Sequence, residues 1–192
     1  MNVEKTNRRT LASIVVIFAV VLLMGVALWA EGRLLICSCG EFKLWISDTC
    51  SSNNSQHLAD PYSFTHILHG FLLFWLVLLM FRHIAPAWQL CLALALEAAW
   101  EVFENTPFVI DHYRTETAAL GYQGDTIVNA YGDLACAWIG FLVARKLGIW
   151  KSIAVFLLIE LVLVIWIKDG LLLQILMLIF PVQMIKLWQM CR

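Results

Sequence analysis

Charged residues are scarce in this chain. Asp, Glu, Lys and Arg make up 14% of its 192 residues, the formal net charge is −1, and no basic block occurs. A nucleic-acid-binding protein gathers Lys and Arg on one surface, so the sequence gives no reason to expect such a partner. Apolar residues, by contrast, form 61% of the chain, and the mean hydropathy is +0.80. This composition is typical of an integral membrane protein and not of a soluble domain of this length.

A recognisable cleavage site is also missing from the amino-terminal segment. The opening MNVEKTNRRT resembles the positive region of a secretory signal, but the apolar run after it covers about 20 residues and has no clear small-x-small site. We therefore expect an uncleaved membrane anchor.

Long apolar windows dominate the chain. A helix of about 20 apolar residues crosses a hydrocarbon core of about 30 Å, and windows of this kind occur at residues 11–30, 63–82, 87–106, 127–147, 149–167 and 170–189. The sequence therefore predicts an all-α fold, a polytopic transmembrane helical bundle of five or six spans in a single integral membrane domain, residues 1–192. The last window contains Gln174, Pro181, Gln183 and Lys186, so a short re-entrant or interfacial helix is the alternative there.

The distribution of Lys and Arg predicts the orientation of the spans. With six spans, the two termini and the even-numbered connections share one side. That side holds nine Lys and Arg residues, namely Lys5, Arg8, Arg9, Arg82, Arg145, Lys146, Lys151, Lys186 and Arg192, and the other side holds four, namely Arg33, Lys43, Arg114 and Lys168. Because Lys and Arg accumulate in cytoplasmic loops, both termini are expected in the cytoplasm and the two long loops, 31–62 and 107–126, outside.

Half of the six cysteines lie in the first outer loop. Cys37 and Cys39 form the motif CSCG, and Cys50 follows it. An oxidising compartment outside the membrane would permit a disulfide from Cys50 to Cys37 or Cys39. Free thiols, or a soft metal ion held by the two thiols of CSCG, are the alternatives that the sequence leaves open.

Polar residues recur at helical spacing inside three of the windows. They are His66 and His69 in the second window, Glu97, Glu101 and Glu104 in the third, and Asp125, Asn129 and Asp133 at the start of the fourth. Such spacings place each set on one face of its helix. The second and fourth windows enter from outside and the third runs outward, so all three faces belong to the outer half of the membrane. We therefore expect one shared polar pocket that opens to the outside.

Neighbouring residues are expected to line or cover this pocket. They are Glu97, Trp100, Asn105, Asn129, His112 and Arg114. Pro107 stops the third helix, and Gly121 and Gly124 permit turns ahead of the fourth. The outer loop 107–126 is thus expected to cover the pocket.

The residue types in this pocket suit a divalent metal ion such as zinc, iron or manganese. His66 and His69 with Asp125 or Asp133 would hold zinc and leave one position open, with Glu101 or Glu104 as a general base. A carboxylate-bridged pair of iron or manganese ions is a second arrangement for the same ligands. The exact motifs Glu-x-x-His and His-Glu-x-x-His are absent. The hypothesis is a metal-dependent enzyme that acts on a lipid or small molecule from the outer side.

Two other classes of function remain open at this point. Buried carboxylates and histidines also serve as proton carriers, so a proton-coupled transporter or binding protein is the first alternative. Against transport, Glu160 is the only acidic residue in the inner halves of the windows, and no internal repeat is evident. The second alternative is a structural or assembly protein without catalysis, in which polar side chains join helices.

Long motifs throughout residues 35–190 resemble a known family. They are CSCG, NSQHLADPYSFTHILHGF, EAAWEVFENTPFVIDHYR, GYQGDTIVNAYGD and IKDGLLLQILMLIFP. With these motifs the chain resembles an uncharacterised family of small bacterial multi-pass inner-membrane proteins. The resemblance implies the bacterial cell inner membrane as the location. The family is one of unknown function, so no catalytic residue is carried over from it.

Overall fold

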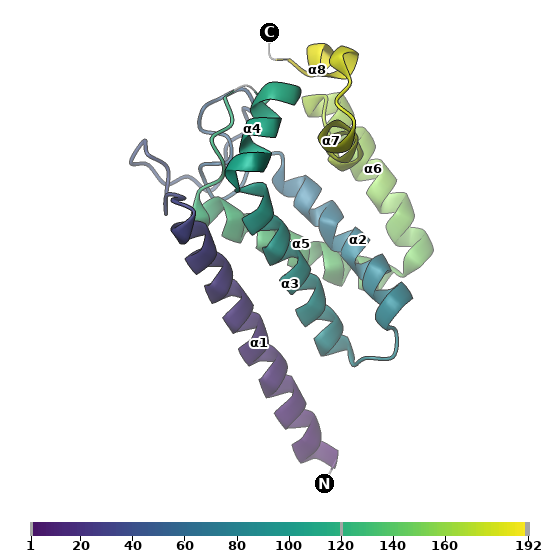
Figure 1. Cartoon of the computed structure of the whole chain (residues 1–192). Coiled ribbons are helices and arrows are strands. Elements are labelled where there is room, and N and C mark those ends of the chain that lie inside the picture. Colours follow the sequence, from purple (N-terminus) through teal and green to yellow (C-terminus); the bar gives the residue numbers. More distant parts are fainter. Residues whose placement is uncertain (1, 120, 191–192) are drawn as a thin grey trace.

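The protein folds into helices joined by turns and one long irregular segment (Figure 1). The structure is a computed structural model that describes residues 2–119 and 121–190. Within these ranges no strand occurs. The helices are α1 (Asn2–Ala30), α2 (Ser63–Phe81), α3 (Pro86–Glu104), α4 (Pro107–Glu116), α5 (Ile127–Leu147), α6 (Ile149–Ile167), α7 (Leu171–Ile179) and α8 (Gln183–Gln189). The predicted all-α fold is confirmed.

Four of the described helices are long and apolar enough to cross a membrane. They are α1 from Thr10 onward, α2, α5 and α6. The helix α3 equals α2 in length, at 19 residues, but Gln89, Glu97 and Glu101 lower its hydropathy. The count of candidate spans is therefore four, and α3 is a fifth long helix that lies beside α1, α2 and α5.

The predicted span at 170–189 is wrong as a single helix. The structure breaks this window into α7 and α8, with Phe180, Pro181 and Val182 between them. Proline has no N–H to donate and cannot continue a helix, which accounts for the break. The nine residues of α7 rise only about 14 Å, less than half of a hydrocarbon core. The alternative of a short helix in this window fits the structure.

The two ends of the bundle carry different segments. The irregular segment 31–62, α4, α7 and α8 gather at one end, which we call the outer end, and the α2–α3 turn lies at the other, the inner end (Figure 1). The side chain of Lys186 in α8 donates to the carbonyl oxygen of Thr115 at the end of α4. The first turns of α1 lie at the inner end. The start of α1 and α8 thus lie at opposite ends of the bundle, whereas six spans would bring the two terminal segments to the same end.

The sequence predicted that 107–126 is a loop. The structure differs, because Pro107–Glu116 forms the helix α4. Pro107 ends α3 and also occupies the first turn of α4, where its missing N–H costs nothing. Thr106 caps the new helix by accepting a hydrogen bond from the Val109 amide. Gly124, with φ of +83°, makes the turn before α5.

The irregular segment 31–62 is tied to the start of α5. The first amides of a helix have no partner within it, and the segment supplies acceptors. Leu34 O accepts from Ile127 N at 2.9 Å, and Leu35 O accepts from Val128 N at 3.2 Å. Farther along α5, a Cβ atom on Gly132 would lie 1.9 Å from the carbonyl oxygen of Leu58. The segment therefore packs closely over the outer end of α5.

Glycines allow α2 and α5 to approach each other at backbone distance. A Cβ atom on Gly140 would lie 2.0 Å from Ile67 O, and one on Gly70 would lie 2.1 Å from Ala137 O. Small residues at a helix crossing permit such contact in membrane proteins. This crossing fixes the histidine-bearing face of α2 against α5.

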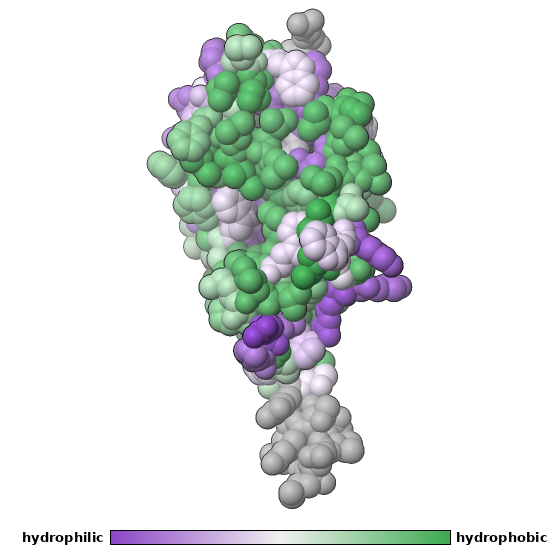
Figure 2. All heavy atoms as spheres, turned by 90° about the vertical axis from the view of Figure 1, so that its right-hand side faces the viewer, coloured by the Kyte–Doolittle hydropathy of each residue, from purple (hydrophilic) through white to green (hydrophobic). Residues whose placement is uncertain are grey.

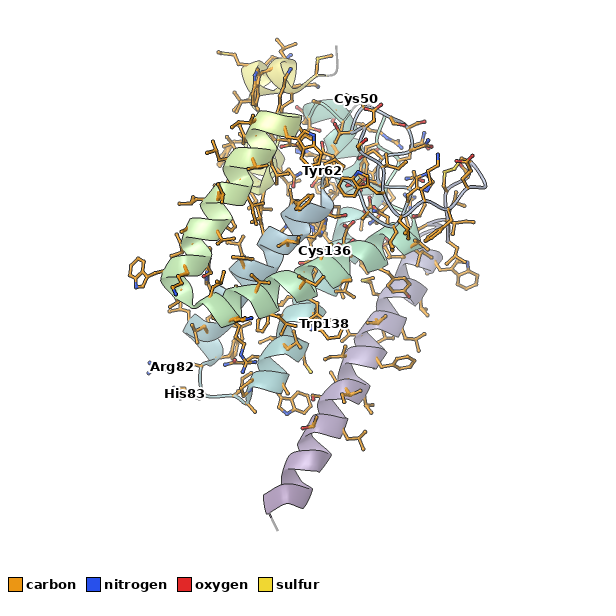
Figure 3. All side chains as sticks on the ribbon, turned by 180° about the vertical axis from the view of Figure 1, so that it is seen from behind. Cys50, Tyr62, Arg82, His83, Cys136 and Trp138 are labelled. Atoms are coloured by element: carbon orange, nitrogen blue, oxygen red, sulfur yellow. A yellow bond between two sulfur atoms is a disulfide. The ribbon has the colours of Figure 1, made fainter. Side chains whose placement is uncertain are left out.

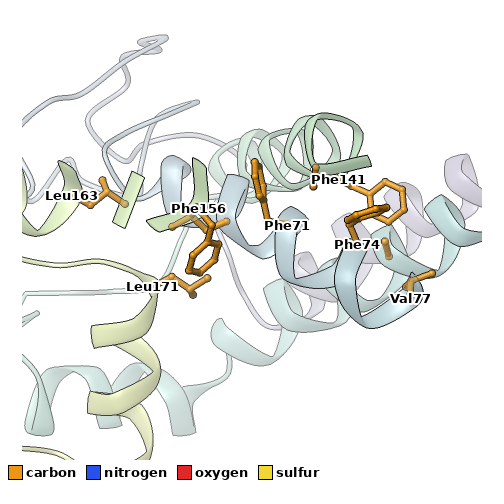
Figure 4. Close-up of a cluster of buried hydrophobic side chains, with 10 residues drawn as sticks. Phe71, Phe74, Val77, Phe141, Phe156, Leu163 and Leu171 are labelled. Carbon is orange, nitrogen blue, oxygen red and sulfur yellow. The ribbon is translucent and has the colours of Figure 1, made fainter. Parts of the chain in front are cut away.

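Below the polar residues, the bundle has an apolar core. Phe71 and Phe74 of α2 pack with Phe141 of α5, and Phe156 of α6 and Leu171 of α7 complete the cluster (Figure 4). The Phe74 and Phe141 rings meet edge to face, with centroids 5.7 Å apart. This packing holds α2, α5, α6 and α7 in fixed rotation about one another.

The outer surface of the bundle is also apolar. Figure 2 shows a broad band of hydrophobic residues across the middle of the molecule, with hydrophilic residues toward both ends. Leu79, Trp150 and Ile165 are exposed over 82%, 84% and 74% of their surfaces. Large apolar surfaces of this extent occur where lipid or protein covers them. The four apolar helices thus fit a membrane protein.

Candidate metal centre

Two histidines of α2 converge on one carboxylate of α3. The Nδ1 atoms of His66 and His69 lie 2.8 and 2.9 Å from the same oxygen of Glu97, Oε1. The i, i+3 spacing places both rings on one face of α2, with centroids 4.8 Å apart. Glu97 is only 2% exposed. The arrangement is a constellation of two imidazoles and a carboxylate in which His66 and Glu97 are buried and His69 is partly buried.

A second carboxylate of α3 borders this constellation without a hydrogen bond of its own. Glu101 Oε1 forms an ion-pair contact with His66 Nδ1 at 3.1 Å. Both Glu101 oxygens are buried and lack a hydrogen-bond partner among the described residues, and the residue is 0% exposed. Because a buried polar group without a partner costs stability, such a group points to a ligand or to a chemical role.

Asp133 of α5 lies on the other side of the His66 ring. Its Oδ2 atom is 4.0 Å from His66 Nε2, and its Oδ1 atom accepts a hydrogen bond from the Ser63 hydroxyl at 2.8 Å. The carboxylate is 4% exposed. His66 thus stands between carboxylates contributed by two helices.

The donor atoms form two overlapping sets that share His66. The first set is His66, His69 and Glu97, and the second is His66, Glu101 and Asp133, with the ligand atoms of each set within 4.8 Å of one another. Imidazole nitrogen and carboxylate oxygen are ligands for zinc, iron and manganese. Two histidines and one glutamate make a three-ligand zinc set with one open position. The residues present therefore fit a divalent metal ion.

A cavity of about 1150 Å³ leads from the outer end toward these residues. Its lining includes His66, Asp133 and Glu104 at the polar end, and Tyr62, Tyr113, Tyr122 and Trp166 along its walls. Figure 3 places Tyr62 at the outer end of α2, far from Arg82 and His83 at the inner end. The cavity gives a small molecule or a lipid headgroup a path to His66.

Asp125 lies outside both sets, although the sequence offered it as a metal ligand. Its Oδ2 atom accepts from Asn105 Nδ2 at 2.8 Å, and its Oδ1 atom accepts from the Tyr122 hydroxyl at 3.0 Å. Asn105 also binds the Asp125 amide through Oδ1 at 2.7 Å. Burial raises the pKa of Asp125 above its ordinary value. These bonds tie the start of α5 to the end of α3.

The remaining residues of α3 and α5 take separate positions. Glu104 lines the cavity and accepts a hydrogen bond from Tyr113 of α4. The Trp100 ring meets the His69 ring edge to face at 5.8 Å, and the Trp100 Nε1 atom is buried without a partner within the described part of the chain. Asn129 is 1% exposed, and its Nδ2 atom likewise has no partner there.

Two residues of α4 that the sequence assigned to the pocket lining face elsewhere. His112 Nε2 donates to the carbonyl oxygen of Met177 in α7 at 3.4 Å. Arg114 donates through Nε to the Tyr122 carbonyl oxygen and lies 3.7 Å from Asp111. Neither side chain belongs to the cavity lining. They attach α4 to its neighbours because the helix turns these faces away from the cavity.

The cysteines of the segment 31–62 pair differently from the expectation. Cys37 and Cys39 are bonded to each other, with Cα atoms 5.1 Å apart. The expected bridge from Cys50 to Cys37 or Cys39 is therefore wrong. The Cys50 amide donates to Asp48 Oδ1 at 2.9 Å, which belongs to a separate turn.

Sequence reasoning missed Asp60 and Ser63 in the surroundings of the centre. Asp60 accepts from Ser55 N and Tyr62 N, both at 2.8 Å, and its amide donates to the Ser63 hydroxyl at 3.2 Å. Burial raises the pKa of Asp60 above its ordinary value. The available signal was the Asp60-Pro61 pair just before a helix, because Asp at such a position binds nearby backbone amides.

The fold and the apolar surface fit the class of helical membrane proteins. Within it, the chain belongs to the family described as "Protein of unknown function (DUF2585)", whose model matches residues 28–191. This confirms that the sequence motifs identify an uncharacterised family of unknown function. The match includes every residue of the candidate centre and excludes most of α1.

Bacterial relatives match along nearly the whole chain. A UPF0314 protein of Agrobacterium fabrum is 44% identical over 168 residues, which cover 88% of this chain and 85% of the relative. A UPF0314 protein of Rhizobium johnstonii is 41% identical over 189 residues, 98% of this chain and 97% of the relative. One of Brucella anthropi is 39% identical over 174 residues, 91% and 88% of the two chains. No solved structure matches the chain.

Proposed function

We propose that this protein is a metal-dependent enzyme of the bacterial inner membrane that acts on a lipid or small molecule in the outer half of the bilayer. The observation that carries the proposal is the convergence of His66 Nδ1 and His69 Nδ1 on Glu97 Oε1, beside the unpartnered carboxylate of Glu101. In this proposal His66, His69 and Glu97 hold one divalent ion.

The neighbouring carboxylates have different roles in the proposal. Asp133 faces the Nε2 atom of His66, where a carboxylate orients a metal-binding histidine by accepting its other N–H. Glu101 is the general base, because its oxygens lie beside the set and are not used by any hydrogen bond. A bound ion would supply a Lewis acid for a carbonyl or phosphoryl oxygen of the substrate. The substrate enters by the cavity that His66 and Asp133 line.

The proposed topology has five spans, α1, α2, α3, α5 and α6, in one membrane domain. The amino terminus is then cytoplasmic, and the segment 31–62, α4, α7 and α8 are periplasmic. The inner end retains the positive residues Arg82, Arg145, Lys146 and Lys151, as the preference of Lys and Arg for short cytoplasmic loops requires. The cavity then opens toward the periplasm.

Transport and a purely structural role receive less support from the geometry. Glu160, the single acidic residue expected on an inward path, accepts from Leu171 N at 2.7 Å and caps the start of α7. Hydrogen bonds between helices stabilise a membrane bundle, but Glu101 makes only an ion-pair contact with His66, at 3.1 Å, and no oriented hydrogen bond with the described residues. Its buried carboxylate is therefore a cost for which binding or catalysis is the better explanation.

The test is the metal content of the protein purified in mild detergent. About one zinc, iron or manganese ion per chain is expected in the parent, and His69→Ala and Glu97→Gln should lose it. The matched control is Asp125→Asn, which changes a buried carboxylate outside the set and should retain the ion. Equal metal content in His69→Ala, Glu97→Gln and the parent, or none in a correctly folded parent supplied with each metal, would overturn the proposal.

A further inference from the structure

The disulfide between Cys37 and Cys39 encloses a single residue, Ser38. A cross-link restricts the unfolded chain more when it closes a longer loop, so this short bridge contributes little to the stability of the fold. It lies at the outer end of the molecule, and both cysteines belong to the lining of the cavity. Stabilisation alone therefore does not explain the bridge.

The two sulfur atoms differ in exposure and in hydrogen bonding. Cys37 is buried, at 5% exposure, whereas Cys39 is exposed. The backbone amide of Cys39 donates to Cys37 Sγ at 3.1 Å. An incoming thiolate can reach Cys39, and Cys37 has a donor in place to stabilise negative charge on its sulfur.

A buried histidine stands beside the pair. One ring nitrogen of His57 and the two sulfur atoms all lie within 4.8 Å of one another, and His57 is 3% exposed. Its Nδ1 atom accepts a hydrogen bond from the Lys43 amide at 3.2 Å, and its Nε2 atom has no partner within the described part of the chain.

The bond from Lys43 selects the tautomer of His57. An Nδ1 atom that accepts a hydrogen bond carries no proton, so in the neutral ring Nε2 carries it. Burial lowers the pKa of His57 below its ordinary value, which favours the neutral ring. An Nε2–H group is unsuited to bind a metal ion but is suited to donate to a thiolate.

We propose that Cys37 and Cys39 form a redox-active disulfide that oxidises dithiols reaching the outer end of the protein. A thiolate of the dithiol attacks Cys39 Sγ, the bond between the two sulfurs breaks, and its electron pair leaves on Cys37 as a thiolate. The second thiolate of the dithiol then attacks its own sulfur in the mixed disulfide and releases Cys39. The dithiol loses two electrons and two protons and becomes a disulfide. The Cys37–Cys39 pair gains the two electrons, Cys39 takes up one proton, and the other proton passes to solvent while Cys37 stays a thiolate.

The roles of the neighbours follow from this sequence. The Cys39 amide stabilises the Cys37 thiolate, and in this proposal the His57 ring, which has one nitrogen within 4.8 Å of both sulfurs, turns its N–H toward that thiolate once the bridge opens. Both effects favour the reduced form and make the pair more oxidising. His57 is a positioning residue, since it acts through Cys37. The site is independent of the proposed metal centre, because no residue is common to the two sets.

The test is a redox titration of the full-length protein in detergent at pH 7. The protein is equilibrated with reduced and oxidised dithiothreitol or glutathione, free thiols are alkylated, and mass spectrometry measures the reduced fraction of Cys37 and Cys39. We expect reduction in glutathione buffers that leave structural disulfides intact. A peptide with two cysteines, added to the oxidised protein, should be oxidised at one peptide per protein. Comparing its oxidation with that of glutathione and dithiothreitol shows whether the site prefers a protein dithiol or a small thiol.

Variants of His57 provide the controls. His57→Phe removes the donor and should lower the equilibrium constant for reduction about tenfold, a shift of about 30 mV toward more reducing potentials. His57→Gln retains a side-chain N–H and should restore part of the shift. Cys37→Ser with Cys39→Ser should abolish the exchange and leave the metal content of the His66 centre unchanged, so the failures of the two proposals are distinguishable.

Three results would overturn the proposal. The first is a Cys37–Cys39 bond that resists glutathione as structural disulfides do. The second is an identical potential in the parent and in His57→Phe. The third is stoichiometric zinc binding by the reduced pair that His57→Phe removes, which would make the cluster a metal site.

Discussion

His66 Nδ1 of α2 lies 2.8 Å from Glu97 Oε1 of α3. This contact joins two helices that run in opposite directions, and it lies at the centre of the buried polar cluster. Glu101, one helical turn after Glu97, has no hydrogen-bond partner among the described residues. The two glutamates on this face of α3 therefore differ. Glu97 accepts hydrogen bonds from two histidines, and Glu101 accepts none from the described residues.

The two glutamates should respond oppositely to removal of their charge. Glu101→Gln should stabilise the metal-free protein by about 1–3 kcal/mol, because a buried carboxylate that accepts no oriented hydrogen bond is expensive, and its contact with His66 competes with the shorter hydrogen bond from His66 to Glu97. Glu97→Gln should destabilise it by a similar amount, because His66 and His69 lose a charged acceptor. Thermal unfolding in detergent with a chelator measures both. If both variants shift the midpoint in the same direction, the distinction between the two carboxylates is wrong.

Glu101→Gln should also keep the bound ion. In the proposed arrangement Glu101 is a base and not a ligand, so its replacement leaves metal content at the parental level while His69→Ala loses it. Elemental analysis of the purified variants makes the comparison. Loss of metal in Glu101→Gln would move Glu101 into the ligand set.

The crossing of α2 and α5 should tolerate no added methyl group. In Gly140→Ala the new Cβ would meet Ile67 O at 2.0 Å, so the helices must separate, at a cost of about 1–3 kcal/mol. The matched control is Gly121→Ala, where nothing lies within 4 Å of the added Cβ. The melting temperatures of the two variants give the answer. A Gly140→Ala protein as stable as Gly121→Ala would mean that α2 and α5 do not pack in this way.

Glu160 should hold the start of α7 in place. Its Oε1 atom lies 2.7 Å from Leu171 N and 3.4 Å from Leu172 N, amides that have no partner within their own helix. A helix cap contributes about 1 kcal/mol. Glu160→Ala should therefore speed hydrogen exchange at both amides roughly five- to tenfold. Glu160→Gln retains an acceptor and should change the rate less. Equal protection in the parent and in Glu160→Ala would exclude the cap.

The contact of α8 with the α6–α7 turn should weaken as pH rises through the pKa of Asp169. Asp169 Oδ1 accepts from Gly170 N at 2.8 Å and from Gln189 Nε2 at 3.0 Å, and burial raises the pKa of its carboxyl from 3.8 to about 6.

The sign follows from proton uptake. Between the unfolded value of 3.8 and the folded value of about 6, the closed state binds more protons than the open one, so its stability falls as pH rises and is constant above that window. Hydrogen exchange of α8, corrected for intrinsic rates, should show less protection at pH 7 than at pH 5. Asp169→Asn should remove this dependence, and a dependence that survives it would assign the effect to another group.

The orientation of α8 is testable by labelling. Met184 in α8 is 81% exposed and Trp150 at the start of α6 is 84% exposed. In intact cells a charged thiol reagent should label Met184→Cys and should reach Trp150→Cys only after the membrane is permeabilised. The parent chain gives the background from its own cysteines. Labelling of both sites on the same side would overturn the five-span topology.

Much of the helical fold was predictable because apolar runs and breaker residues are local features. The windows 127–147 and 149–167 coincide with α5 and α6, and 63–82 differs from α2 by one residue. The prediction of one helix at 170–189 was wrong because a hydropathy average hides a single proline, whereas Pro181 prevents the backbone from continuing as a helix. The segment 107–126 failed because Pro107 was interpreted only as a stop, although proline also begins helices.

By itself, the sequence determined the long apolar helices, the apolar surface and the spacing that places His66 with His69 and Glu97 with Glu101 on common faces, because these depend on residues within one helix. Only the tertiary structure decided how the faces meet. The rotation and crossing of α2, α3 and α5 join Glu97 to both histidines, direct Asp125 to Asn105 and Tyr122, and leave Glu101 unpartnered within the described residues. That rotation depends on contacts such as Gly140 with Ile67, between residues far apart in the chain, which helical periodicity does not encode.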